Sequence, residues 1–126
     1  MVKRRKGGSS SAAAALRTAL PEGLQVIEVS ASATVEVDVD VNEMTIPYTI
    51  GYDSAILIKS LVDRRETIAP LVAGKHRLGW SFAHNLKNWK HRLVLNVDGV
   101  PTVLEERSET NKDPDHSVGV AFLIVT

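Results

Sequence analysis

The feature that most constrains the fold is the alternation of apolar and polar side chains between residues 76 and 97. Such a period of two marks strands that bury one face. Asp98-Gly99 follows, the strongest short-range signal for a hairpin, and returns the chain through residues 100–104. We therefore predict a three-strand antiparallel meander over residues 76–104. The residues that share the buried parity are large: His76, Leu78, Trp80, Phe82 and His84, then Trp89, His91, Leu93, Leu95 and Val97.

Further short runs flank the meander and predict an all-β fold. The run 55–62 also fits a helix capped by Asp53, but its shortness and its isoleucines favour a strand, with a turn at 63–65. Pro47 indicates an edge or bulge in its strand. About eight short strands predict an antiparallel β-sandwich, jelly-roll or immunoglobulin-like. The strands predicted outside the meander are 24–32, 34–41, 44–50, 55–62, 67–72 and 118–125.

Composition bounds the number of domains. A chain of 126 residues, 44% hydrophobic and 24% charged, has room for one globular domain, which we place at residues 21–126. The absence of cysteine excludes disulfides and thiolate metal sites. The longest uncharged apolar run, 118–125, is too short to cross a membrane as a helix. No signal peptide is recognised, and the localisation stays open.

Residues 1–20 are predicted to form a basic arm. They are rich in Gly, Ser and Ala, carry five basic residues and no acid, and include Lys3, Arg4, Arg5 and Lys6. Such an arm is either flexible in solvent or docked on a partner, and the partner can be an acidic protein surface, nucleic acid or anionic lipid.

Charge is segregated along the rest of the chain although the net charge is zero. Residues 21–74 have three basic and nine acidic side chains, a net charge of −6, whereas residues 75–98 have five basic and one acidic, a net charge of +4. The two groups are a basic face on the meander, Arg77, Lys87, Lys90 and Arg92, and an acidic row, Glu36, Asp38 and Asp40. They either neutralise each other within one sheet or meet between subunits.

A two-residue turn at Asp98-Gly99 also predicts which side chains face each other across the hairpin. Counting outward from that turn, Arg92 faces Glu105, His91 faces Glu106, and Leu93 faces Leu104. Opposite charges that face each other across a ladder contribute roughly 0.2–1 kcal/mol each.

The two tryptophans raise the possibility of a ligand site. Trp89 lies beside His84, Asn85 and Asn88, and exposed aromatic rings in β-sandwiches can stack on sugars. However, Trp80 and Trp89 share the parity of the apolar residues, which favours core packing.

Metal binding and catalysis find little support. Asp38-x-Asp40-x-Asn42 resembles the opening of a calcium loop, but Glu43 and Thr49 stand where Gly and Glu are needed. A loop with Asp113, Asp115 and His116 could bind a surface cation only weakly. There is no nucleophile motif and no glycine-rich phosphate loop. We expect no cofactor, no metal site and no enzyme activity.

The function expected from these patterns is a non-enzymatic structural or interaction subunit. The final run, 118–125, is apolar on both parities and needs cover on both sides, from within the fold or from a neighbour. Together with the basic arm and the segregated charge, this predicts a self-assembling chain or a component of a larger assembly, such as a virion or a surface layer. The alternatives are a module that binds carbohydrate or another small ligand, and nucleic-acid contact through the basic arm.

Overall fold

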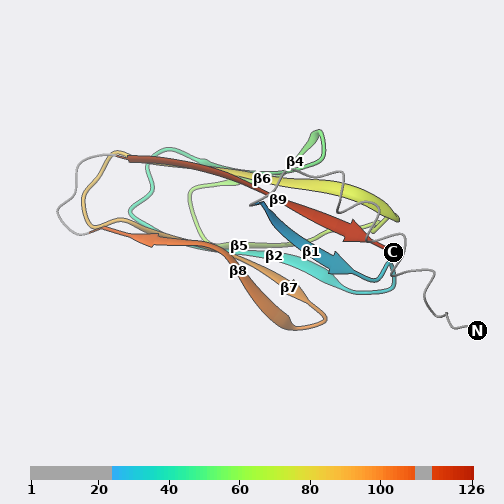
Figure 1. Ribbon diagram of the computed structural model, residues 1–126. Coiled ribbons are helices and arrows are strands. Elements are labelled where there is room, and N and C mark those ends of the chain that lie inside the picture. The colour runs from blue at the N-terminus through green and yellow to red at the C-terminus, as the bar shows by residue number, and fades with distance from the viewer. Residues whose placement is uncertain (1–23, 110–114) are drawn as a thin grey trace, which may run out of the picture.

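The alternating runs form nine strands in the part of the chain that the computed structural model describes, residues 24–109 and 115–126 (Figure 1). The predicted basic arm, with Lys3, Arg4, Arg5 and Lys6, lies outside the described residues. The strands are β1 (Gln25–Val29), β2 (Val35–Asn42), β3 (Tyr48–Tyr52), β4 (Ala55–Ser60), β5 (Arg64–Thr67), β6 (Gly74–His84), β7 (Lys90–Val97), β8 (Val100–Ser108) and β9 (Asp115–Val125).

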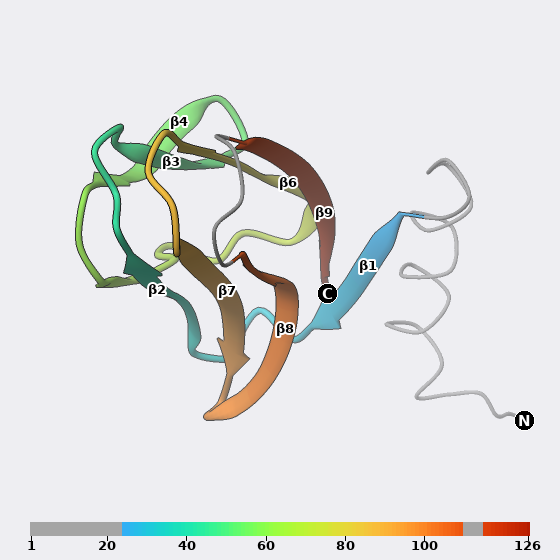
Figure 2. The same ribbon diagram turned by 90° about the vertical axis from the view of Figure 1, so that its left-hand side faces the viewer.

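The strands are arranged in two sheets that form the layers of a sandwich (Figures 1 and 2). The five-stranded sheet has the order β1-β9-β6-β3-β4, and the four-stranded sheet has the order β5-β2-β7-β8. All pairs are antiparallel except β1 with β9, which are parallel. The prediction of an all-β, two-sheet sandwich is therefore confirmed. The described residues include no helix long and apolar enough to span a membrane.

The core lies between the inner faces of the two sheets. Val35, Val37 and Val39 of β2 are fully buried, as the strict alternation of that run predicted. Burying one such aliphatic side chain contributes about 1.5–3 kcal/mol to folding, so the inner faces supply the main driving force. The other large buried side chains include Tyr48, Ile50, Ile58, Leu78, Phe82, Trp89, Leu93, Leu95 and Leu123.

The predicted three-strand meander is wrong at its first connection. β6 pairs with β3 and β9 in the five-stranded sheet, whereas β7 and β8 belong to the four-stranded sheet. Residues 85–89 therefore carry the chain from one layer to the other. Alternation shows that β6 and β7 each bury one face, but two such strands can face each other across the core as well as pair side by side.

Three further strand predictions can be compared with the structure. Residues 55–60 form the strand β4, so the preference for a strand over a helix is confirmed. The predicted strand 67–72 is wrong, because β5 spans Arg64–Thr67 and takes in part of the predicted turn. Beyond it, Pro70 follows a cis peptide bond and has no N–H for a ladder. β3 begins at Tyr48, after Pro47, rather than at Met44.

The doubly apolar final strand is covered from within the fold along part of its length. β9 lies between β6 and β1, and Ala121, Leu123 and Val125 are buried in the core. On the opposite parity Ile124 is also buried, whereas Val118 is 67% exposed. The sheet position explains why the strand is apolar, but its first half still presents an apolar side chain to solvent.

Trp80 packs flat against the backbone of β9 at Gly119, its cross-strand neighbour. A Cβ atom on Gly119 would lie 2.4 Å from two carbons of the indole ring, far inside contact distance. Gly119 is thus required by the packing of a large core side chain. Gly79 on the neighbouring strand differs, because a Cβ there would meet nothing closer than 3.8 Å.

We predict that Gly119→Ala lowers the free energy of unfolding by about 1–3 kcal/mol, because Trp80 must shift out of its place in the core. Gly79→Ala is the matched control and should leave the stability unchanged or slightly raised, since a strand gains from a side chain that meets no clash. Urea unfolding followed by tryptophan fluorescence measures both. Equal losses in the two variants would contradict this account of Gly119.

Candidate functional site

One end of the sandwich holds polar side chains inside the core. His84 of β6, His91 of β7 and Ser117 of β9 have exposed fractions of 2%, 1% and 8%. Glu105 of β8 reaches the same place, with 15% of its side chain exposed. The histidines arrive there because they continue the inward parity of Phe82 and Leu93. Four neighbouring strands from both sheets thus contribute to one polar cluster, which we call the histidine–glutamate cluster.

A β-bulge places Glu105 in the cluster. Near the turn, Val97 pairs with Val100, as predicted, but the register shifts by one residue between Leu93 and Val94. Leu93 then faces Glu105, Arg92 faces Glu106 and His91 faces Arg107, so the three predicted pairings here are wrong. A bulge inserts one residue into a strand and redirects the side chains that follow. Leu104 and Glu105 consequently both contact the core.

The hydrogen bonds of the cluster follow one consistent direction. An ionised Glu105 can accept hydrogen bonds but cannot donate them, so the Nε2–H of His91 donates to its Oε2. The Nδ1 atom of neutral His91 then accepts from the Nε2–H of His84 at 2.8 Å. Ser117 Oγ donates to Oε2 at 2.7 Å, and Trp80 Nε1 donates to Oε1 at 2.9 Å. Three donors thus compensate one buried carboxylate.

Aromatic rings separate the two histidines from solvent. Phe82 stacks on His91 and Trp89 stacks on His84, each with ring centroids 4.0 Å apart and planes 6° from parallel. The guanidinium of Arg107 lies 5.8 Å from the centroid of Trp89 and pairs with Asp115 at 2.8 Å. Among the described residues, His84 Nδ1 has no hydrogen-bond partner, which fits a neutral ring.

Burial and hydrogen bonding set the protonation of the cluster. Burial, together with the neighbouring His91, lowers the pKa of His84 to about 4. Burial also lowers the pKa of His91, although the hydrogen bond and the charge of Glu105 oppose the shift. Burial alone would raise the pKa of Glu105, but hydrogen bonds from Ser117, Trp80 and His91 outweigh it and lower that pKa. At neutral pH the cluster therefore holds one carboxylate and two neutral imidazoles.

The residues of the predicted basic face lie on different parts of the fold. Arg77 projects from β6 in the five-stranded sheet, Lys90 and Arg92 belong to β7 in the four-stranded sheet, and Lys87 lies in the connection between them. The change of layer between β6 and β7 thus divides the basic residues between two sheets.

The predicted acidic row lies along β2, in the same sheet as Arg92. Asp40 is the register partner of Arg92, and Asp38 pairs with Arg65 of β5 at 2.8 Å. Arg92 also pairs with Glu106 at 3.2 Å. Glu36 lies on the same strand, opposite Asn96 and Thr67. Along β2, therefore, acidic and basic side chains are neighbours within one sheet.

The residues predicted as a possible ligand contact are used inside the fold. Trp89 is 1% exposed and stacks on His84, which is buried as well. Asn85 forms a hydrogen bond with the hydroxyl of Thr45, and the carbonyl of Asn88 accepts a hydrogen bond from Asn42 at 3.4 Å. Both tryptophans are thus core residues, as their parity indicated.

The residues considered for a metal are also engaged elsewhere or lie apart. Asp38, Asp40 and Asn42 are spread along β2, and Asp115 binds Arg107. His116 Nε2 lies 3.0 Å from Ser81 Oγ, and Asp113 lies outside the described residues. Within residues 24–109 and 115–126, no group of three His, Asp or Glu side chains is placed to hold a metal ion.

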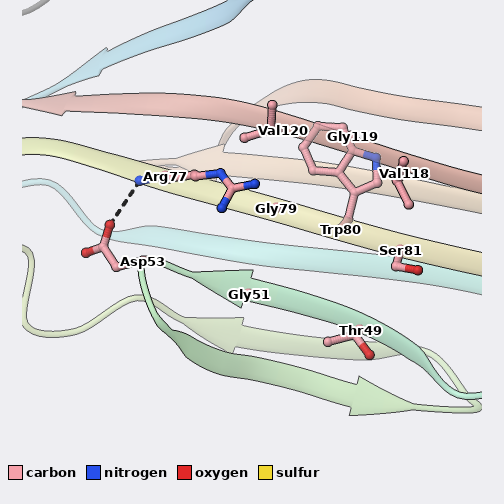
Figure 3. A pocket seen from close by; sticks show the side chains of 10 residues that line it. All are labelled: Thr49, Gly51, Asp53, Arg77, Gly79, Trp80, Ser81, Val118, Gly119 and Val120. Atoms are coloured by element: carbon pink, nitrogen blue, oxygen red, sulfur yellow. Dashed lines mark hydrogen bonds between the residues drawn. The ribbon is translucent and has the colours of Figure 1, made fainter.

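A groove of about 560 Å³ crosses the outer face of the five-stranded sheet (Figure 3). Its floor is the cross-strand pair Gly51 and Gly79, where two neighbouring strands lack side chains. The side chain of Arg77 runs along β6 toward Gly79 (Figure 3). The hydroxyls of Thr49 and Ser81 lie on the other side of the glycines, and Val118 and Val120 line the flank formed by β9. We call this the glycine groove.

We predict that Glu105→Gln lowers the free energy of unfolding by about 1.5–3 kcal/mol. The NH₂ group of the glutamine would replace one carboxylate oxygen, and a side chain that donates to that oxygen would lose its acceptor. Glu106→Gln is the matched control on the next position, where the ion pair with Arg92 is exposed and worth at most about 1 kcal/mol. Urea unfolding at pH 7 compares the two. A loss for Glu106→Gln as large as for Glu105→Gln would count against the cluster as a stabilising unit.

The cluster also predicts how stability depends on pH. Unfolded His84 titrates near pH 6.5 and folded His84 near pH 4, so the unfolded state binds more protons between these values. The free energy of unfolding should therefore fall as the pH drops from 6.5 to 4, by at most about 1.4 kcal/mol per pH unit for each proton. His84→Phe should make this dependence shallower in urea unfolding.

His76 offers the control for that experiment. Burial lowers the pKa of His76, but its hydrogen bonds to Asp53 and to the carbonyl of Val72 outweigh burial and raise that pKa, so its stabilising contribution is complete below pH 6.5 and is lost only at higher pH. His76→Asn should thus keep the dependence of the wild type between pH 6.5 and 4. An unaltered dependence in His84→Phe would show that His84 does not titrate as its burial requires.

Comparisons with protein-family models, with curated proteins and with solved structures gave no match for this chain.

Proposed function

We propose that this chain is a non-enzymatic structural or interaction subunit that assembles through protein–protein contacts, in a larger assembly such as a virion or a surface layer. The observation that carries the proposal is the edge strand β8. It ends the four-stranded sheet, and its first residues are exposed although several of them are apolar.

The exposed part of β8 belongs to a projecting hairpin. Val100 is 66% exposed and Val103 is 41% exposed. The tip of the β7–β8 hairpin is hydrogen-bonded through Asp98 to Thr34, just before β2, while β8 forms the open side of the hairpin (Figure 1). Apolar side chains on an uncovered edge are a liability for a protein that stays alone in solution. A partner surface that covers them removes that liability.

Pro101 indicates which kind of contact the edge supports. Val97 and Val100 flank the two-residue turn and form a hydrogen-bonded pair, so the backbone groups of the next residue point to the open side. Pro101 has no N–H to offer there. A partner strand would find a missing donor at this position, which favours contact through the side chains of Val100 and Val103.

The position of the acid–base groups supports a role without catalysis. Two groups of ionisable side chains with shifted pKa values lie close together: His84, His91 and Glu105 in the core, and His76 with Asp53 nearer the surface. The core group does not line the glycine groove; Asp53 does, but its two oxygens accept hydrogen bonds from His76 Nδ1 and from the backbone N–H of Arg77. General acid–base catalysis requires the catalytic group within hydrogen-bonding reach of the substrate, which a sealed cluster does not provide.

Between the two predicted types of sandwich, we propose the immunoglobulin-like one. The order β9-β6-β3-β4 has the same succession in sequence and space as the G-F-C-C′ sheet of variable-type immunoglobulin domains. The hairpin β7–β8 stands between β6 and β9 in the chain and extends the opposite sheet.

The two alternative functions have less support. A carbohydrate-binding module would need an exposed ring, and Trp89 is buried in the core. Nucleic-acid contact would depend on Lys3, Arg4, Arg5 and Lys6, which lie outside the described residues.

We predict that the full chain forms oligomers at high concentration and that the double variant Val100→Asp/Val103→Asp is monomeric, because two carboxylates would have to be buried at the contact. Size-exclusion chromatography with light scattering measures the mass. Val72→Asp is the control, since Val72 is also an exposed valine, at 55%, but lies outside β8. A wild type that stays monomeric at several concentrations would refute the proposal.

A further inference from the structure

One of the two glycines in the floor of the glycine groove, Gly79, has no explanation within the chain, whereas Gly51 lies beside a β-bulge in the ladder between β3 and β4. Gly51 and Gly79 are direct cross-strand neighbours in the middle of the sheet, and neither has a positive φ. A Cβ atom would approach other atoms only to 3.5 Å at Gly51 and 3.8 Å at Gly79, which is ordinary contact. Glycine weakens a strand, and inside one it often marks a place where another molecule approaches closely. The contrast with Gly119, which Trp80 requires, sharpens the point.

The surroundings of the two glycines define what could enter. Across the sheet, Gly79 is followed by Val120 on β9, and Val118 and Val120 line that side of the groove, so this wall is apolar. Neighbouring strands lie about 4.8 Å apart, so two missing side chains leave room for about one aliphatic side chain. Val118 is 67% exposed and lines the space.

The groove also carries a cation beside its floor. Arg77 is exposed, and among the described residues its guanidinium has no hydrogen bond or ion pair. Asp53 is close, but its two oxygens accept from His76 Nδ1 and from the backbone N–H of Arg77. The groove therefore suits an aliphatic side chain with a carboxylate nearby, the pairing that an arginine fork recognises best.

The tip of the β7–β8 hairpin has this chemistry. It presents the exposed side chain of Val100 two residues after the exposed Asp98, whose Oδ1 accepts a hydrogen bond from the backbone N–H of Thr34 at 2.8 Å, so that Oδ2 is the oxygen a partner can reach. The hairpin belongs to the four-stranded sheet, whereas the glycine groove lies on the face of the other sheet that points away from the core. The tip of one molecule cannot reach its own groove.

We propose that the glycine groove receives the β7–β8 hairpin tip of a second copy of this chain, with Val100 above Gly51 and Gly79 and Asp98 paired with Arg77. The inference rests on the proposed assembly function and names its two surfaces. Because the tip and the groove are different parts of the molecule, the contact is heterologous, and repeated addition gives a closed ring or an open filament rather than a symmetric dimer.

Two single variants of the full chain test this contact from its two sides. Gly79→Val fills the groove with a residue that strands favour, so it should fold with undiminished stability in urea and yet be monomeric by light scattering. Val100→Asp removes the apolar tip and should also be monomeric. Arg77→Gln should assemble more weakly than the wild type, and its assembly should be less sensitive to salt, since a charge pair is lost.

The decisive measurement is an equimolar mixture of the two monomeric variants. Gly79→Val keeps an intact tip and Val100→Asp keeps an intact groove, so one contact can form between them. The mixture should give a heterodimer and nothing larger, because the remaining tip and the remaining groove are both disabled. A mixture of Gly79→Val with Gly79→Val/Val100→Asp, which has no intact groove, is the control and should stay monomeric.

The outcomes separate this inference from the proposed function. If the wild type assembles and Gly79→Val assembles with the same affinity, the glycine groove is not the contact, while assembly through other surfaces stands. If both variants are monomeric but their mixture also stays monomeric, the tip and the groove are not partners. If the wild type itself is monomeric, both proposals fail.

Discussion

The burial of one carboxylate joins the two layers of this sandwich. Glu105 extends from the four-stranded sheet and accepts hydrogen bonds from Trp80 and Ser117 of the five-stranded sheet, as well as from His91 of its own. A single charge inside a protein is costly unless donors surround it, so these side chains stabilise it as a set. Trp80 in turn needs Gly119 beneath its ring, and His91 needs the stacked rings of Phe82 and His84. The two carboxylate oxygens of Glu105 thus constrain the relative positions of β6, β7, β8 and β9.

This arrangement makes one end of the fold sensitive to protons. The histidines are neutral because burial disfavours their charged form, and they form a chain of hydrogen bonds that ends at Glu105. The same rings that keep water out would keep a substrate out. A protonated His84 would lie among Trp89, His91 and Arg107, where nothing favours a second positive charge except Asp115, which is shared with Arg107.

On the surface of the molecule, the informative features are a groove where two glycines lack side chains and a hairpin tip whose apolar side chains are exposed. In the acidic row along β2, Asp38 pairs with Arg65 and Asp40 lies opposite Arg92, so charges that looked segregated in the sequence are neighbours within the four-stranded sheet. The hairpin tip with Val100 and the glycine groove with Arg77 remain exposed on the surface. These two features support a function of contact between copies.

The sequence by itself determined the strands that alternate strictly, β2, β6 and β7, and the face that each of them buries, because alternation records the two sides of a strand directly. It identified the valines of β2, both core tryptophans and the turn at Asp98-Gly99. The tertiary structure alone decided the sheet to which each strand belongs, since β6 and β7 bury one face in either arrangement. It also decided the histidine–glutamate cluster, because the bulge before Glu105 shifts the register by one residue and brings into the core a carboxylate that a regular hairpin would direct to solvent. A bulge depends on packing across the two sheets, which a pattern along one strand does not contain.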